Sequence, residues 1–273
     1  MDTSEFSPFP PRNWHSEGMS SRSAKIAAQR PFYASHADAY DALITDSATP
    51  WVTAVQEILG PSNPGVTRVL DAGCGTGRHA QALIELGYSV SLLDASADLL
   101  AIARERCPSA SATLGDICGF TTRFPFDAIT CRGVLNDLVT DQERADALMA
   151  FANALKPGGM LILDVREAEG SEVRADGRTR RAEVDLKSGG HLRFASTPHW
   201  GAGLIEVTET YELTAPSGTS AAHHYRFQMR PWTRQELQQR LDSAGFSAIT
   251  ISAGVGRTTP DRLLVVARVA PET

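Results

Sequence analysis

The chain has 273 residues, of which 42% are hydrophobic and 21% charged, a composition typical of globular proteins. Its formal net charge of −6 argues against a general nucleic-acid binder, which usually carries a basic excess, so we expect no nucleic-acid partner. No run approaches the roughly 20 apolar residues that a bilayer span requires. The first thirty positions also contain no apolar signal-peptide core, so we expect no membrane partner and a cytoplasmic location.

The cysteines and histidines predict neither a disulfide framework nor a metal site. The four cysteines, Cys74, Cys107, Cys118 and Cys131, show no C-x-x-C spacing and are typical of reduced, buried thiols. His223 and His224 are adjacent, and neighbours on a strand point to opposite faces, so they do not predict a shared metal ion. We therefore expect no bound metal.

In chain order, residues 1–30 are rich in serine and proline and predict a mobile arm. From residue 31 the aromatic residues follow near-helical spacing. Between residues 67 and 165 strand-like and helix-like segments alternate, which predicts a parallel sheet. Ser96 is placed to cap one of the helices, and Thr140 with Glu143 forms a capping box before another.

The pattern changes after residue 167. Four segments of alternating polarity, 180–186, 191–196, 204–213 and 222–229, are separated by turns rich in glycine, serine and proline, which predicts an antiparallel sheet. Thr233 and Glu236 then begin a helix that ends near Gly245, and segments 249–252 and 263–269 predict two last strands. We expect three parts: an arm (1–30), a core (31–166 and 231–273) and an antiparallel β extension (167–230).

The most informative motif is the segment Val69-Leu-Asp-Ala-Gly-Cys-Gly-Thr-Gly-Arg-His79. Three glycines alternate after Asp71, at a place where an apolar strand gives way to a helical pattern. Glycine there lets the backbone approach a ligand closely. A dinucleotide-binding turn would need G-x-G-x-x-G, and Arg78 stands at the last position of that pattern, so the dinucleotide spacing fails.

This motif resembles motif I of the class I S-adenosylmethionine-dependent methyltransferases. Further along the chain, Asp94 and Asp116 end two short strand patterns, 126–131 predicts a fourth strand, and Leu155-Lys-Pro-Gly-Gly159 resembles the family's loop before strand five. The resemblance implies an α/β, doubly wound, Rossmann-like sheet of seven mostly parallel strands. Within the family, the layout is similar to the glycine and amino-sugar N-methyltransferases, where the antiparallel extension lies between strand five and the last helix–strand unit.

The resemblance also implies which residues bind S-adenosylmethionine. Asp71 would order the glycine loop and face the ammonium group of the methionyl tail, and Asp94 would accept hydrogen bonds from the ribose hydroxyls. Asp116 and Ile117 would frame the adenine. The remaining expected cofactor contacts are Gly73, Gly75, Gly77, Arg78 (to the tail carboxylate), Cys131 and Tyr40.

The methyl acceptor leaves weaker signals, because in-line methyl transfer depends mainly on alignment and needs a base only where the nucleophile carries a proton. We expect acceptor contacts from Tyr33, Arg132, Asn136, Arg166 and Tyr225. If a general base exists, His199 or His36 is the candidate.

The sequence therefore predicts a methyltransferase acting on nitrogen or oxygen of a small molecule. The alternatives are a nicotinamide-dependent oxidoreductase on a similar sheet, a non-catalytic cofactor-binding module, or a macromolecular methyltransferase. The last is disfavoured by the net charge and by Cys131-Arg-Gly-Val134 where an N-P-P-Y-like tetrapeptide would stand. Free edges of the β extension could pair two chains into a homodimer.

Overall fold

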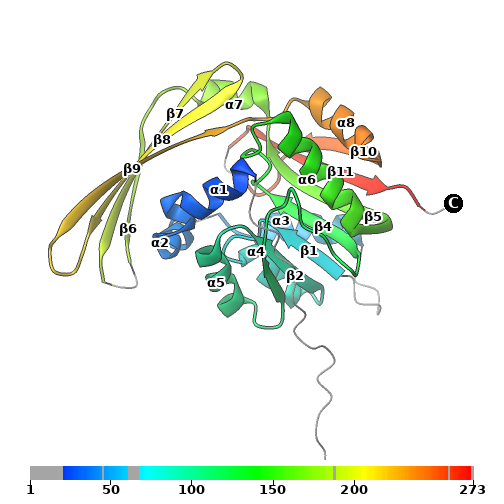
Figure 1. The fold of residues 1–273 in the computed structure, drawn as a ribbon, viewed down its shortest axis with the longest axis horizontal. Coiled ribbons are helices and arrows are strands. Elements are labelled where there is room, and N and C mark those ends of the chain that lie inside the picture. The colour runs from blue at the N-terminus through cyan, green and yellow to red at the C-terminus, as the bar shows by residue number, and fades with distance from the viewer. Residues whose placement is uncertain (1–20, 45, 61–67, 187–188, 258, 272–273) are drawn as a thin grey trace, which may run out of the picture.

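The computed structural model describes residues 21–44, 46–60, 68–186, 189–257 and 259–271. Its centre is a seven-stranded sheet in the order β10-β11-β5-β4-β1-β2-β3 (Figure 1). Strands β1 to β5 pair in parallel, whereas β11 is antiparallel to both β5 and β10. The strands are β1 (Arg68–Ala72), β2 (Ser89–Asp94), β3 (Ser111–Leu114), β4 (Phe126–Arg132), β5 (Leu155–Arg166), β10 (Phe246–Ala253) and β11 (Arg262–Val269). The expected α/β fold is confirmed, except that residues 155–159 begin β5 instead of forming a loop.

Helices cover both faces of this sheet and bury two apolar clusters. On one face, α3 (Thr49–Leu59), α4 (Arg78–Glu85) and α5 (Ala97–Arg106) pack around Trp51, Leu83 and Leu100. On the other face, α6 (Asp141–Ala154) and α8 (Arg234–Ser243) contribute Phe151 and Leu237 to the larger cluster. Because helices cover both faces, ligands are expected at the carboxyl ends of the strands.

The helix starts follow the local sequence signals. The Thr140 hydroxyl accepts a hydrogen bond from the Glu143 N–H, and the Glu143 carboxylate accepts one from the Thr140 N–H, so the predicted capping box is complete. Ser96 caps α5 and Thr233 caps α8 as expected. These caps satisfy N–H groups that a helix leaves free at its first turn.

The second sheet has four antiparallel strands in the order β6-β7-β8-β9. These strands are β6 (Arg180–Asp185), β7 (His191–Gly201), β8 (Leu204–Thr214) and β9 (Ser220–Met229), close to the expected segments. A short helix that the sequence did not suggest, α7 (Ala168–Arg174), connects β5 to this sheet. Figure 1 shows the second sheet projecting beside the core, with α1 and α2 between the two.

The N-terminal segment differs from the expected mobile arm. Residues 22–29 form helix α1 (Arg22–Gln29), and the 3-10 turn η1 (Pro31–Tyr33) and helix α2 (Ala37–Leu43) follow it. Ile26 of α1 packs with Val207 and Phe227 of the second sheet, and Phe32 packs against Tyr211. Apolar burial therefore orders a segment that composition alone assigned to the arm, whose residues 1–20 lie outside the described residues.

Candidate functional site

The glycine loop lies at the carboxyl end of β1, the central strand of the parallel part of the sheet. Gly73, Gly75 and Gly77 all have positive φ, at 69°, 55° and 77°, which side chains with a Cβ resist. The N–H of Gly73 donates to the carbonyl of Leu93 at the end of β2 (2.7 Å), so the loop is fixed to the neighbouring strand. The backbone conformation of the loop therefore favours glycine at all three positions.

Asp94 ends β2 and holds the same loop from the other side. Its carboxylate accepts hydrogen bonds from the N–H groups of Gly75 (2.7 Å) and Ser96 (2.8 Å). Burial nevertheless raises the pKa of Asp94 above its ordinary value, and these backbone hydrogen bonds counter the rise. The carboxylate lines the cavity beside the loop, where its remaining lone pairs are free to accept donors from a ligand.

Asp116 follows the end of β3 and also lines this cavity, together with Ile117. Its carboxylate accepts the N–H of Cys118 (2.9 Å) and, on the other oxygen, the N–H of Ser21 (3.1 Å). The start of helix α1 therefore lies directly against the acid that was expected to meet the adenine.

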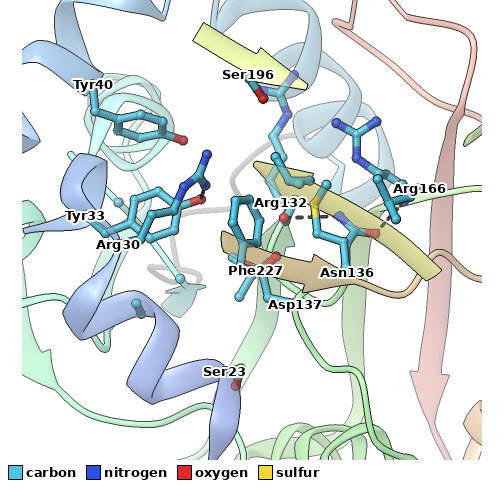
Figure 2. A pocket seen from close by; sticks show the side chains of 18 of the residues that line it. Ser23, Arg30, Tyr33, Tyr40, Arg132, Asn136, Asp137, Arg166, Ser196 and Phe227 are labelled. Atoms are coloured by element: carbon cyan, nitrogen blue, oxygen red, sulfur yellow. Dashed lines mark hydrogen bonds between the residues drawn. The ribbon is translucent and has the colours of Figure 1, made fainter. Parts of the chain in front are cut away.

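These residues belong to one large cavity of about 360 Å³ between the core sheet, α1 and the second sheet. A second cavity of about 250 Å³ adjoins it at Gly73 and Gly75 and is bounded by Tyr40 and Arg132 as well. Figure 2 shows Arg30, Tyr33 and Tyr40 of the N-terminal segment facing Asn136, Asp137 and Arg166 across the larger cavity. The two cavities together form a continuous candidate site around the glycine loop.

Asp71 and Arg78 line the second cavity, but Arg78 does not have a free guanidinium. It donates to the backbone carbonyls of Ile44 and Asp46 and so ties the N-terminal segment to α4. Asp71 accepts a hydrogen bond from Thr130 (3.0 Å), and burial raises its pKa to about 6. A buried carboxyl of this kind gains from a cationic ligand group.

Arg132 is better placed than Arg78 to meet an anionic ligand group, because it borders both cavities. One end of its guanidinium contacts the His79 ring (2.6 Å), whose pKa burial lowers to about 3, so the imidazole is neutral. Its buried Nε has no hydrogen-bond partner among the residues that the structure describes. A ligand carboxylate at this cavity would supply the missing acceptor.

The structure brings together most of the expected acceptor contacts. Tyr33, Arg132, Asn136 and Arg166 all line the larger cavity, whereas Tyr225 does not. The Asn136 side chain is already engaged, since its oxygen accepts the Arg166 N–H (2.7 Å) and its amide group donates to the Gly133 carbonyl (3.2 Å). Asn136 therefore holds the chain after β4 against the end of β5.

Five expected site residues lie outside both cavities: Gly77, Cys131, Tyr225, His36 and His199. Cys131 is fully buried in the core beneath the site. His36 is buried against Tyr211, with ring centroids 5.7 Å apart, and burial lowers its pKa. His199 is exposed on β7. Neither histidine is brought to the cavity that holds Asp94 and Asp116, so geometry does not favour them as bases.

The cavity also contains charged side chains that sequence reasoning missed. They are Arg30, Asp137, Arg174, Arg180, Glu209, Arg257, Asp261 and Arg262, which come from segments throughout the chain. Arg30 forms an ion pair with Glu209, Arg166 with Asp261, and Arg262 with Asp164. No local motif marks these residues, because the sheet edge and the extension bring them together only in the folded chain.

Comparison with known proteins identifies the class. A model of the methyltransferase domain matches residues 69–159. The Bacillus subtilis (strain 168) protein named "Putative methyltransferase YqeM" is 31% identical over 243 residues, covering 84% of this chain and 92% of that protein. The Streptomyces fradiae dTDP-3-amino-3,6-dideoxy-alpha-D-glucopyranose N,N-dimethyltransferase is 28% identical over 194 residues, covering 70% of this chain and 74% of that one.

Solved structures agree on the fold. The sugar N-methyltransferase KedS8 from Streptoalloteichus superposes with a TM-score of 0.75 at 20% identity, covering 100% of this chain and 99% of that one. The chain belongs to the S-adenosylmethionine-dependent methyltransferases, as its motifs predicted, and its cofactor is S-adenosylmethionine. The relatives described here give no support to a nicotinamide-dependent oxidoreductase.

The residues at the site fit this cofactor. Beside the glycine loop, the strand-end carboxylates of Asp94 and Asp116 suit its ribose and its adenine. The buried carboxyl of Asp71 suits its ammonium group, and the Nε of Arg132, which has no partner among the described residues, suits its carboxylate. Among the described helices, none is long and apolar enough to cross a membrane.

Proposed function

We propose that this methyltransferase transfers its methyl group to the amino nitrogen of a small sugar that carries an anionic activating group, a nucleoside diphosphate. Three curated relatives are named as N,N-dimethyltransferases of dTDP-linked amino sugars, from Streptomyces fradiae, Streptomyces venezuelae and Saccharopolyspora spinosa. These names describe those proteins, and the charges of this chain's own cavity supply the independent argument.

The observation that carries the proposal is the unpaired guanidinium of Arg174. It lines the same cavity as Asp94 and Asp116, and it makes no side-chain hydrogen bond or ion pair within the described ranges. Burial lowers its pKa, which reflects the free energy needed to keep the charge partly out of water. Arg180 and Ser196 line the same wall, so a diphosphate group would find a cation and further donors there.

The cofactor supplies an activated methyl group on a sulfonium, and the protein supplies alignment. In our proposal Arg132 and Asp71 hold the methionyl tail and Asp94 holds the ribose. The cationic wall at Arg174 fixes the far end of the acceptor, so that the amine points toward the glycine loop. Holding nucleophile and methyl carbon in line contributes several kcal/mol to lowering such barriers.

The direct test is incubation of the purified protein with S-adenosylmethionine and the three dTDP-linked amino sugars named for the relatives. Release of S-adenosylhomocysteine would be measured and the methylated product identified by mass and by NMR of the new N-methyl group. The 3-hydroxy counterpart of the S. fradiae acceptor tests methylation at oxygen. Methylation of an amino sugar is the expected result, and turnover of only the hydroxy sugar, or of none, would refute the proposal.

The anionic group is tested separately with Arg174→Gln. We expect the KM for the dTDP-linked sugar to rise at least tenfold, since a hydrogen bond to a charged group contributes roughly 1.5–3 kcal/mol. Affinity for S-adenosylhomocysteine should be unchanged. Arg178→Gln is the matched control, because Arg178 is on the same segment, with a side chain 87% exposed and outside the cavity. Equal effects of both substitutions would point to general charge and not to a contact.

A further inference from the structure

Asp137 lines the larger cavity beside the expected acceptor contacts Asn136 and Arg166, and its carboxyl group has no partner among the described residues. Its carboxyl group lines the cavity (Figure 2), and no hydrogen bond or ion pair of that side chain occurs within the described residues. Asp137 is half-buried, and in native structures a carboxyl group in such a place is usually satisfied by protein, water or ligand. The space in front of Asp137 is the space where a ligand would lie.

The backbone around Asp137 is held from both sides. Its own N–H donates to the Val134 carbonyl (2.9 Å). The Asn136 side chain is fixed between Gly133 and Arg166, and the Leu138 carbonyl accepts the Nε of the buried Arg144 (3.0 Å). The backbone from which the Asp137 side chain enters the cavity is therefore held in place.

The cations near Asp137 are already engaged with other acids. Arg30 at the end of α1 pairs with Glu209 of β8, Arg166 at the end of β5 pairs with Asp261, and Arg262 of β11 pairs with Asp164 (2.9 Å). Among the described residues, Asp137 also influences the titration of Tyr33 of η1, Tyr225 of β9 and Cys131 of β4. A positively charged or N–H-bearing ligand group is therefore the natural partner of this carboxyl.

We propose that Asp137 binds the amino group of the acceptor and accepts the proton that methyl transfer releases. This inference rests on the proposed function, because it requires an amine as the methylated group. The side chain of Val134 lies against Gly73 of the glycine loop. Asp137 is three residues after Val134, so the acid and the loop are joined through this short segment. The amine would lie between the loop and the acid.

The chemistry balances without another reagent. An acceptor that enters as an ammonium first gives a proton to the Asp137 carboxylate, and the freed lone pair attacks the methyl carbon. The nitrogen–carbon bond forms as the carbon–sulfur bond breaks, and that electron pair stays on sulfur. The methylated nitrogen then carries a positive charge, and it returns to the neutral amine by giving a proton to the carboxylate once the first proton has left to solvent.

The electrostatics of the site agree with this role. Burial raises the pKa of Asp137 to about 6, Glu209 adds to the rise, and Arg30, Arg166 and Arg262 oppose it. A base with a pKa near the working pH is well matched to proton transfer. The cationic cofactor would lower that value, so we expect the active form to be lost as pH falls through about 6 or slightly below.

The test compares Asp137→Asn with the wild type on the dTDP-linked amino sugar that the wild type methylates. Asparagine keeps the size and can still accept a hydrogen bond, but it takes up no proton. We expect kcat to fall at least a hundredfold at pH 7.5, in the range typical for loss of a general base, and the acidic limb of the kcat profile to disappear. Calorimetry should give unchanged S-adenosylhomocysteine affinity and weaker binding of the amino sugar to that complex.

Asp137→Ala with added formate covers the case in which the asparagine variant folds poorly, since a free carboxylate can enter the space left by the side chain. The expected result is partial rescue of kcat by formate in Asp137→Ala, and no change of kcat with formate in the control Asp98→Ala, which removes an exposed acid on α5. A kcat for Asp137→Asn within threefold of wild type, with the same acidic limb, would overturn the inference while leaving the proposed function intact. A wild type without activity on any amino sugar overturns both.

Discussion

Alanine substitution should destabilise the protein much more at Gly73 than at Gly75, although both glycines have positive φ and lie two residues apart. A Cβ built at Gly73 would lie 2.3 Å from Cγ2 of Val134, far inside contact distance. A Cβ at Gly75 would meet no heavy atom within 4 Å, and Gly75 lines both cavities. Gly73 lines both cavities as well, so both substitutions affect the space for the ligand, but only Gly73→Ala also disturbs the packing of the protein.

The magnitudes follow from these contacts. Left-handed backbone costs a residue with a Cβ about 1–2 kcal/mol, which applies to both positions. Overpacking against Val134 adds about 1–3 kcal/mol at Gly73 alone. We expect Gly73→Ala to lower the free energy of unfolding by about 2–5 kcal/mol and Gly75→Ala by about 1–2 kcal/mol. Gly75→Ala should nevertheless weaken S-adenosylhomocysteine binding, because the new methyl group enters the ligand space.

Urea unfolding of the protein without ligand, followed by circular dichroism, measures the first quantity, and calorimetric titration with S-adenosylhomocysteine measures the second. The double variant Gly73→Ala/Val134→Ala removes the clash and keeps the strain, so it should be more stable than additivity of the two single variants predicts. Equal stability of Gly73→Ala and Gly75→Ala, or purely additive effects with Val134→Ala, would refute the packing argument.

Three further predictions concern buried carboxylates. Asp94→Ala removes the acceptor of two backbone N–H groups, so its free energy of unfolding should fall by about 2–4 kcal/mol, besides the loss of cofactor affinity. Unchanged stability would contradict the role of these loop contacts. Glu209→Gln leaves the guanidinium of Arg30 without its carboxylate and should cost about 3 kcal/mol, much of which Arg30→Met should restore in the double variant. The raised pKa of Asp71, about 6 against an ordinary 3.9, means that its contribution to stability is full below about pH 4 and is lost as pH rises through 6. Relative to wild type, the free energy of unfolding of Asp71→Asn should therefore be up to about 3 kcal/mol higher at pH 7.5 than it is at pH 4. Urea unfolding without ligand at both pH values measures this difference, and a difference independent of pH would disprove the shift.

The position of the residues expected to bind the cofactor could be predicted because these residues obey local rules. A loop that needs positive φ at alternate positions needs alternate glycines, and an acid that ends a parallel strand lies at the ligand edge of the sheet. Gly73, Gly75, Asp94 and Asp116 all line the cavity for these reasons. Arg78 fails the same logic, because a long side chain at the start of a helix can turn to backbone carbonyls, as it does here.

The acceptor side could be predicted only in part, because no single segment contains it: Tyr33, Asn136 and Arg166 line the cavity as expected, but the expected bases do not. His36 and His199 were natural choices as bases by residue type, yet one packs into the apolar layer under α2 and the other faces solvent. Asp137 carries no motif and stands in a loop where an acid reads as an ordinary polar residue. Only the folded chain shows that the three nearby arginines pair with other acids and leave Asp137 without a partner among the described residues.

Helix α1 explains why the acceptor cavity depends on the whole fold. Its first turn is fastened to the core, where Ser21 and Ser23 donate N–H groups to Asp116 (3.1 Å) and Glu143 (2.9 Å). At the other end, Arg30 pairs with Glu209 of the second sheet. The helix thus joins the two sheets across the cavity and fastens to the acid expected at the adenine. A segment assigned by composition to a mobile arm supplies one wall of the site, because its apolar face finds the second sheet and its polar ends find buried acids.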